Sequence, residues 1–312
     1  MSRYLIYPAM LLAGVFGFLL HAGMASAQEL EPRTYSASPI GTNFIDVGYT
    51  RLTGDVLTDP SLPITNVEAT INTYALSYVR SFGLAGHSAS LAVGLPYVDG
   101  NLRGSVIDAP TELHRSGMGD MRMRFGFNLI GSPALTPEEF ARRTPTASLG
   151  VSLTIAAPTG QYSPDRLVNI STHRWAFKPE IGISKPMGKW FLEASAGVYF
   201  FTTNHDFYGG NVRSQDPLAT VQLHGGYTFH PGFWIAGDVG YVDGGGSSVN
   251  GVSKADRQSN ARYGLTLSAP LGRGWQAKLA LSNGLVTRIG GDYKSITFAV
   301  QYRWFDRRSN GI

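Results

Sequence analysis

The most constraining feature of this sequence is an alternation of apolar and polar residues that recurs along the chain. Twelve stretches show it, each over roughly ten residues, which is the length and period of a tilted strand that crosses a membrane. In the last stretch one face carries Ile296, Phe298, Val300, Tyr302 and Trp304. The opposite face is mostly polar, so one face suits lipid and the other suits water. The pattern predicts an all-β, antiparallel, up-and-down transmembrane β-barrel.

The predicted strands and their connections alternate in a regular way. The strands are expected at residues 43–52, 68–81, 87–97, 118–130, 146–157, 173–185, 189–202, 217–230, 232–243, 258–270, 273–284 and 293–305. The apolar phase of the second strand slips between Ile71 and Tyr74, which predicts a bulge there. Long polar connections follow the odd strands, at Asp99–Gly117, Thr159–Thr172, Thr203–Asp216 and Gly244–Arg257. Tight turns follow most even strands, which puts both termini in the periplasm and the long loops outside the cell.

One connection breaks this rule, because residues 131–145 form a long periplasmic link. It contains Pro137-Glu138-Glu139, which predicts a short helix with proline in its first turn.

The first residues read as a secretory signal. Arg3 precedes an apolar run that is too short for a membrane helix, and Ala25-Ser26-Ala27 is a small-residue cleavage site. We therefore expect residues 1–27 to be a signal peptide, 28–42 a periplasmic N-terminal segment, 43–305 the barrel and 306–312 a periplasmic tail. The expected location is the outer membrane of a Gram-negative cell, reached with the help of export and barrel-assembly machinery.

Composition agrees with a barrel and excludes several other classes. The chain of 312 residues has 38 Gly, 15 Tyr and 16 Phe, and glycine disfavours helices by about 1 kcal/mol per position. A net charge of +4 gives no reason to expect nucleic acid as a partner, and the absence of cysteine excludes disulfides and thiol chemistry.

Tryptophans mark the expected edges of the lipid-facing band. Interfacial aromatics are typical of membrane barrels, whereas a soluble sandwich or lectin-like barrel, the main alternative, has no reason to place them at strand ends. The predicted interface residues are Trp175, Trp190, Trp275 and Trp304. Trp234 also lies near a strand end but is out of phase with its lipid-facing neighbours.

The chain resembles a known family from Glu31-Pro32-Arg33 onward. The matching stretches are 38–44 (SPIGTNF), 59–63 (DPSLP), 95–97 (LPY), 117–120 (GMGD), 158–162 (PTGQY), 174–180 (RWAFKPE), 215–218 (QDPL) and 260–262 (NAR). They resemble the outer-membrane "transporter" family named for the meta-cleavage pathway of phenol degradation. The resemblance implies an outer-membrane barrel that moves hydrophobic or aromatic solutes, and it supplies no catalytic residues.

The polar faces of the strands predict a nearly balanced set of charges in the lumen. Candidate lumen or selectivity residues are Arg122, Arg124, Arg174, Lys178, Glu180, Glu193, Asp238 and Arg262. These charges can pair across a narrow bore and close it, or the arginines can form a basic stripe that attracts carboxylates or phenolates. Glu180 is expected opposite Glu193 across the turn at Pro186-Met187, with Lys178 as the cation that relieves their repulsion.

Little in the sequence suggests an enzyme. The histidines lack metal-ligand spacing, and no cofactor is implied. His114 and Ser116 resemble the pair of outer-membrane phospholipases, but their phase here points inward. His224 is expected to be a satisfied lumen residue.

We interpret the chain as an outer-membrane channel or transporter that passively admits small solutes, including aromatic or hydrophobic ones. The alternative is a barrel plugged by its side chains that serves a structural, sensing or adhesion role. A remote alternative is lipid hydrolysis at His114 and Ser116.

Overall fold

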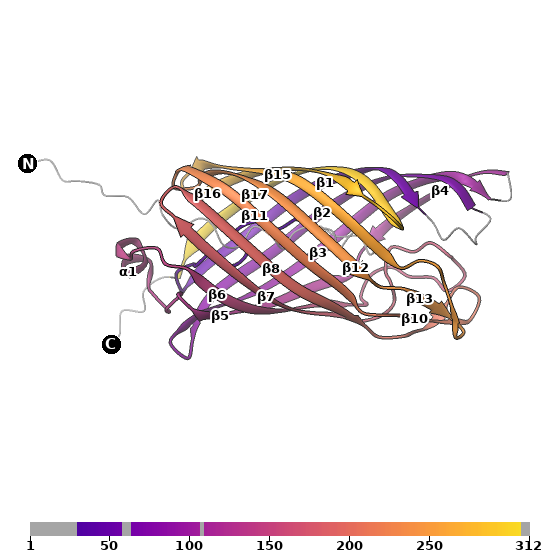
Figure 1. Cartoon of the computed structure of the whole chain (residues 1–312), viewed down its shortest axis with the longest axis horizontal. Coiled ribbons are helices and arrows are strands. Elements are labelled where there is room, and N and C mark those ends of the chain that lie inside the picture. The colour runs from indigo at the N-terminus through magenta and orange to yellow at the C-terminus, as the bar shows by residue number, and fades with distance from the viewer. Residues whose placement is uncertain (1–29, 58–63, 107–108, 307–312) are drawn as a thin grey trace, which may run out of the picture.

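The computed structural model describes residues 30–57, 64–106 and 109–306, and it shows a closed antiparallel β-barrel (Figure 1). The predicted signal peptide lies outside the described residues, as does the predicted tail after Asp306. None of the helices among the described residues has the length and apolar composition needed to span a membrane.

The predicted number of strands is confirmed. The wall contains β1 (Thr42–Leu57), β2 (Ile64–Leu84), β3 (His87–Val106), β4 (Ala109–Met118), β5 (Met121–Ile130), β6 (Ser148–Ala157), β7 (Ala176–Met187), β8 (Trp190–Phe201), β11 (Leu218–His230), β12 (Phe233–Gly244), β15 (Gln258–Gly272), β16 (Trp275–Val286) and β17 (Gly290–Phe305). Both β4 and β5 pair with β3, and they are separated only by Gly119-Asp120, so they form one wall strand. The wall therefore has 12 strands, and it closes where β1 pairs with β17.

The two ends of the barrel differ as the connection lengths predict. The start of β1 and the end of β17 pair with each other at the end of the barrel that carries α1, and the longer loops lie at the other end (Figure 1). The helix α1 (Pro137–Arg142) confirms the prediction for the long periplasmic link. Thr136 caps it, and the hydrogen bonds that Glu139 accepts from the Thr136 backbone and hydroxyl lower the pKa of Glu139.

Three external loops contain regular structure that the sequence pattern did not predict. Residues Asp99–Gly117 were expected to form a loop, but β3 and β4 extend through them as a hairpin, with Arg103 paired to Glu112. At the same end, β9 (Asn204–Phe207), β10 (Asn211–Gln215), β13 (Ser247–Val249) and β14 (Val252–Ser253) form a separate sheet. Short polar strands of this kind carry too weak an alternation to be recognised in a sequence.

The bulge predicted in the second strand is in a different place. Residues Ile71 to Tyr74 pair without interruption with Gly100 to Tyr97, and the register shift lies between Thr65 and Glu68. Ile71 breaks the apolar phase because it faces inward, where it packs against Leu52 and Tyr293. The break in the apolar phase therefore reflects an apolar side chain that faces the lumen, and the strand pairing is continuous at this point.

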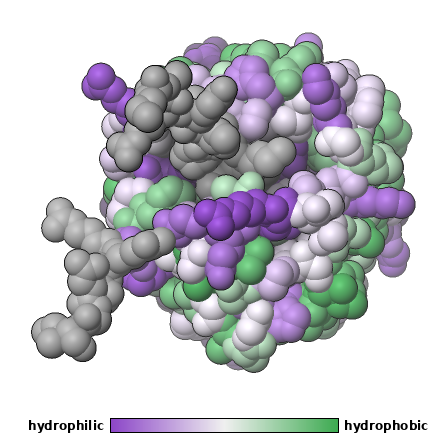
Figure 2. Space-filling model, turned by 90° about the vertical axis from the view of Figure 1, so that its left-hand side faces the viewer, coloured by the Kyte–Doolittle hydropathy of each residue, from purple (hydrophilic) through white to green (hydrophobic). Residues whose placement is uncertain are grey.

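The outer wall has the apolar surface that the alternation predicts. Side chains such as Leu192, Leu223 and Phe298 are about half exposed, which is expected for groups that meet lipid. Viewed from the end with the termini, green apolar residues lie along much of the rim (Figure 2). The four predicted interface tryptophans are exposed, at 42% for Trp175, 60% for Trp190, 47% for Trp275 and 37% for Trp304. Tyrosines accompany them, with the ring centroid of Trp275 4.8 Å from that of Tyr302.

Candidate functional site

The N-terminal segment, residues 30–41, enters the lumen, and this is the main feature that the sequence did not predict. We expected residues 28–42 to lie in the periplasm. Instead, the backbone N–H of Glu31 donates to Gln222 Oε1 at 3.1 Å, and the Ser36 hydroxyl donates to Glu193 Oε1 at 2.8 Å. The backbone N–H of Arg33 also donates to Glu193. The segment is therefore bound to inward-facing side chains of β8 and β11.

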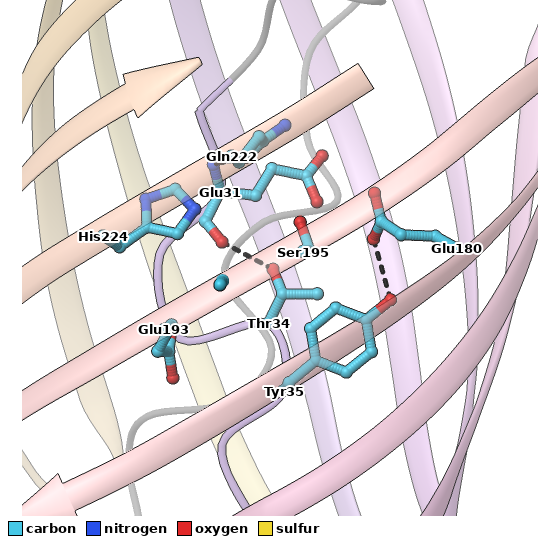
Figure 3. A pocket seen from close by; sticks show the side chains of 9 residues that line it. Glu31, Thr34, Tyr35, Glu180, Glu193, Ser195, Gln222 and His224 are labelled. Carbon is cyan, nitrogen blue, oxygen red and sulfur yellow. Dashed lines mark hydrogen bonds between the residues drawn. The ribbon is translucent and has the colours of Figure 1, made fainter. Parts of the chain in front are cut away.

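Tyr35 anchors this segment at the centre of the site. Its hydroxyl donates to Glu180 Oε1 at 2.8 Å (Figure 3). The same hydroxyl lies 3.0 Å from Ser152 Oγ. Its ring lies directly over Gly182, where an added Cβ would come within 2.2 Å of it. Glycine at this inward position is therefore required by the aromatic ring that packs on it.

The buried charges around Tyr35 compensate one another. Lys178 Nζ lies 2.7 Å from Glu180 Oε2, and an Arg124 nitrogen lies 3.7 Å from Glu180 Oε1. Arg124 also donates to Ser152 at 3.0 Å. We call Tyr35, Arg124, Lys178 and Glu180 the Glu180 cluster. All four side chains are buried or nearly so, and a buried carboxylate is tolerated only when cations and donors surround it in this way.

The predicted partner of Glu180 is partly wrong. Lys178 is its cation, as expected, but Glu180 pairs across the strands with Gly197, whereas Glu193 pairs with Ser184. The Ser184 hydroxyl donates to Glu193 at 2.6 Å. The turn between β7 and β8 is shifted relative to the prediction, so the two carboxylates lie at different heights and each has its own donors.

Arg33 explains the tryptophan that is out of phase. Its guanidinium carbon lies 3.6 Å from the centroid of the Phe191 ring and 5.6 Å from that of Trp234. Trp234 is only 2% exposed and meets Phe191 edge to face inside the barrel. Trp234 is therefore part of the binding surface for the N-terminal segment rather than of the interface with lipid.

The other predicted lumen charge on this side, Asp238, is also satisfied. Its carboxylate lies 2.7 Å from His224 Nδ1 and accepts the Thr266 hydroxyl at 2.7 Å. His224 has the role expected of it, a satisfied lumen residue. Among the described residues, no group of three or more His, Cys, Asp or Glu side chains could hold a metal ion.

Little free space remains beside the N-terminal segment. The space is bounded by Glu31, Thr34, Tyr35, Glu180, Glu193, Ala194, Ser195, Gln222 and His224 (Figure 3). It can hold about one water molecule, which is far smaller than a phenol ring. A small aromatic solute therefore does not fit into this space while the segment is bound.

The remaining predicted residues lie nearer the external end. Arg262 is buried and donates to the backbone carbonyl of Tyr293. Arg174 precedes β7, is 9% exposed and donates to the Gln215 side chain of the external sheet. Arg122 is half-buried on β5 beside Asp120, which accepts hydrogen bonds from Ser171 and from the backbone of Gly160 and Thr172.

The prediction for His114 and Ser116 needs a correction. Both residues are exposed and share the outward phase of Met118, so they do not face the lumen. His114 Nε2 lies 3.0 Å from Asp99 Oδ2 across the hairpin. Within the described chain, no hydrogen bond joins Ser116 to His114, so the arrangement lacks the contact that would activate a serine.

Sequence reasoning missed Glu31, Arg33, Tyr35 and Ser36 because a short segment outside the strands has no periodicity. Two signals could have found them. Glu31-Pro32-Arg33 begins the resemblance to the family, and glycines recur at inward strand positions where a residue from elsewhere can pack. Among these, Gly150 and Gly182 face the Tyr35 ring.

Comparison with solved structures supports the barrel architecture. An outer membrane channel from Pseudomonas putida F1 superimposes with a TM-score of 0.74 at 22% identity, covering 88% of this chain and 100% of that one. The β domain of the Bordetella autotransporter BrkA gives a TM-score of 0.50 at 13% identity, covering 86% and 100% of the two chains. These similarities show a shared fold. No curated protein sequence matches the chain significantly.

The protein is an outer-membrane β-barrel, because its closed wall presents an apolar band with aromatic residues at its edges and shares its fold with outer-membrane barrels. A sequence family matches residues 51–304, which is most of the chain, and the resemblance seen in the short motifs is thereby confirmed. This chain belongs to the family described as "Putative MetA-pathway of phenol degradation".

Proposed function

We propose that this barrel is a channel through which small aromatic or hydrophobic solutes cross the outer membrane passively. The observation that carries this proposal is the division of the lumen into two parts. The external part is lined by aromatic and basic side chains, among them Tyr199, Phe201 and Arg122, whereas the periplasmic part is filled by the N-terminal segment. A lumen built only for rigidity has no need of a separate segment held by polar contacts that can be broken.

The N-terminal segment is the gate in this proposal. It is attached to the wall through hydrogen bonds and a cation–π contact rather than through strand pairing, so its release leaves the barrel wall intact. Release exposes Arg124, Lys178 and Glu180 to the bore, and with them the Phe191 and Trp234 rings. Conduction therefore requires two states, with the segment bound and with the segment displaced.

Solute identity follows from the family and from the neighbours only by analogy. The family name refers to phenol degradation, and the Pseudomonas putida protein is described as an outer membrane channel. Both descriptions are consistent with a lumen whose external end is lined by aromatic and basic side chains. No step of covalent chemistry is needed for passive transfer.

The observation that favours the alternative function is the same N-terminal segment. A permanently bound segment makes the barrel a closed scaffold for the external hairpin and sheet, which would then act in sensing or adhesion. The two functions differ in one property, which is whether the segment ever leaves.

Recording from the mature chain in planar lipid bilayers tests the proposal. We expect discrete current steps, brief in the unmodified protein and longer in a Gly182→Ala variant, in which the added methyl group displaces Tyr35. Liposome swelling with phenol measures the solute flux that accompanies the current. Absence of current steps and of swelling in both proteins, each shown to be folded, would contradict the channel and favour the scaffold.

A further inference from the structure

Two arginines from separate external segments lie near each other, because Arg174 donates to Gln215, which is two residues from Arg213 on β10. Arg174 precedes β7, and Arg213 belongs to β10 of the external sheet, which lies at the end of the barrel away from the termini (Figure 1). Burial and the neighbouring Arg213 guanidinium lower the pKa of Arg174 to about 10, and burial also lowers the pKa of Arg213. We call Arg174 and Arg213 the arginine pair.

The arginine pair is poorly compensated by the protein. One terminal nitrogen of Arg174 donates to Gln215, but Nη1 is buried and has no hydrogen-bond partner among the described residues. Asp120, a nearby carboxylate, already accepts hydrogen bonds from the loop at residues 160–172. Asp256 lies 4.0 Å from Arg213 and accepts the backbone N–H of Ser247 at 2.7 Å.

Both guanidinium groups lie over aromatic rings. The Arg174 guanidinium carbon lies 4.4 Å from the Phe201 centroid, and that of Arg213 lies 5.3 Å from the Phe207 centroid. Phe201 stacks in turn on Tyr199, with centroids 6.0 Å apart. A ring beneath a guanidinium restricts its movement, and the N–H groups that point away from the ring remain available to a ligand.

A carboxylate would be a suitable acceptor for the N–H groups of the arginine pair, because Arg174 Nη1 has no acceptor among the described residues. Leaving a buried guanidinium N–H unpaired is unfavourable, and an anion between two guanidinium groups would satisfy it with charge-assisted hydrogen bonds. We propose that the arginine pair binds the carboxylate of a small aromatic acid at the external mouth, while Phe201, Phe207 and Tyr199 contact its ring. This site would concentrate ionised aromatic solutes before they reach the N-terminal segment, so the inference deepens the proposed function and rests on it.

Isothermal titration of the folded, mature protein in detergent with benzoate tests the site without requiring conduction. We expect Arg174→Gln and Arg213→Gln each to weaken benzoate binding by at least about tenfold, since each removes charged hydrogen-bond donors. Arg103→Gln is the matched control, because Arg103 is an exposed external arginine already paired with Glu112, and it should leave the affinity unchanged. Arg174→Lys should recover part of the affinity, because it keeps the charge without the planar fork.

Two further probes separate the parts of the ligand. Acetate keeps the carboxylate without the ring, and benzyl alcohol keeps the ring without the charge, so both should bind several-fold more weakly than benzoate. Absence of benzoate binding to the unmodified protein, equal binding of acetate, or full affinity in a folded Arg174→Gln variant would each overturn the site. Benzoate binding without bilayer current would support the site and contradict the proposed channel. Bilayer current without benzoate binding would support the channel and contradict the site.

Discussion

In the part of the lumen that the N-terminal segment occupies, Glu180 lies 2.7 Å from Lys178 and accepts the Tyr35 hydroxyl at 2.8 Å, whereas in the external part Arg174 has a buried nitrogen with no hydrogen-bond partner among the described residues. The same antiparallel wall supports both regions. Around Glu180 the buried polar groups are satisfied, because the N-terminal segment supplies the Tyr35 hydroxyl. Around Arg174 a buried N–H is left without an acceptor among the described residues, and this difference distinguishes a closed gate from a surface that receives a ligand.

The largest effect is expected at the Glu180 cluster, where the buried charges depend on one another. Glu180→Gln leaves Lys178 and Arg124 buried without their carboxylate, and breaking a buried ion pair costs about 3–5 kcal/mol of unfolding free energy. Urea unfolding in lipid vesicles measures this loss. Glu112→Gln removes an exposed carboxylate from its pair with Arg103 and should change the unfolding free energy by less than about 1 kcal/mol. Equal losses in the two variants would show that the Glu180 cluster is not a linked unit.

The second effect concerns the fit of Tyr35 against the wall. Gly182→Ala places a methyl group within 2.2 Å of the ring, and overpacking of this kind costs about 1–3 kcal/mol unless the ring moves away. We expect Tyr35 to move, which lengthens the open state in bilayer recordings. Gly237→Ala is the control, because the nearest atom to its added Cβ is the Gly225 carbonyl oxygen at 4.0 Å. Open times that do not differ between the two variants would contradict the role of Tyr35.

A smaller effect is expected from the Tyr35 hydroxyl alone. Tyr35→Phe keeps the ring and removes the hydrogen bond to Glu180, which is worth about 1.5 kcal/mol for a bond to a charged group. The variant should open more often than the unmodified protein and less often than Gly182→Ala. Unchanged opening would assign the anchoring to the ring and not to the hydroxyl.

The smallest effect on stability is expected in the external half. Arg174→Gln removes a buried cation that the protein does not fully satisfy, so the lost stacking on Phe201 is offset by relief of desolvation. Its unfolding free energy should change by less than about 1 kcal/mol, within the usual worth of such stacking. A loss of unfolding free energy as large as that of Glu180→Gln would show that Arg174 has a structural role. It would contradict the proposed difference between the two parts of the lumen.

The sequence predicts the wall well because lipid imposes a strict alternation on every strand. The strand count and the outward tryptophans follow from that constraint, and so does the pairing of Lys178 with Glu180, which lie two residues apart on one face. The alternation says nothing about a segment that lies inside the barrel, so Tyr35 and Arg33 were missed and Trp234 was left without a role. Nor does it fix the register of neighbouring strands, because a shift of four residues keeps every side chain on the same face, and Glu193 was therefore placed opposite Glu180 instead of Ser184.

The most direct test of the gate uses the absence of cysteine from this chain. Ser36 in the N-terminal segment and Ser184 on β7 have their hydroxyl oxygens 3.4 Å apart, so a double variant with Ser36→Cys and Ser184→Cys places two sulfurs within bonding reach. With the disulfide formed, we predict no current steps in planar bilayers, and steps like those of the single-cysteine variants after reduction. Equal conductance of the oxidised and reduced forms would contradict the claim that the N-terminal segment must leave the lumen for solutes to pass.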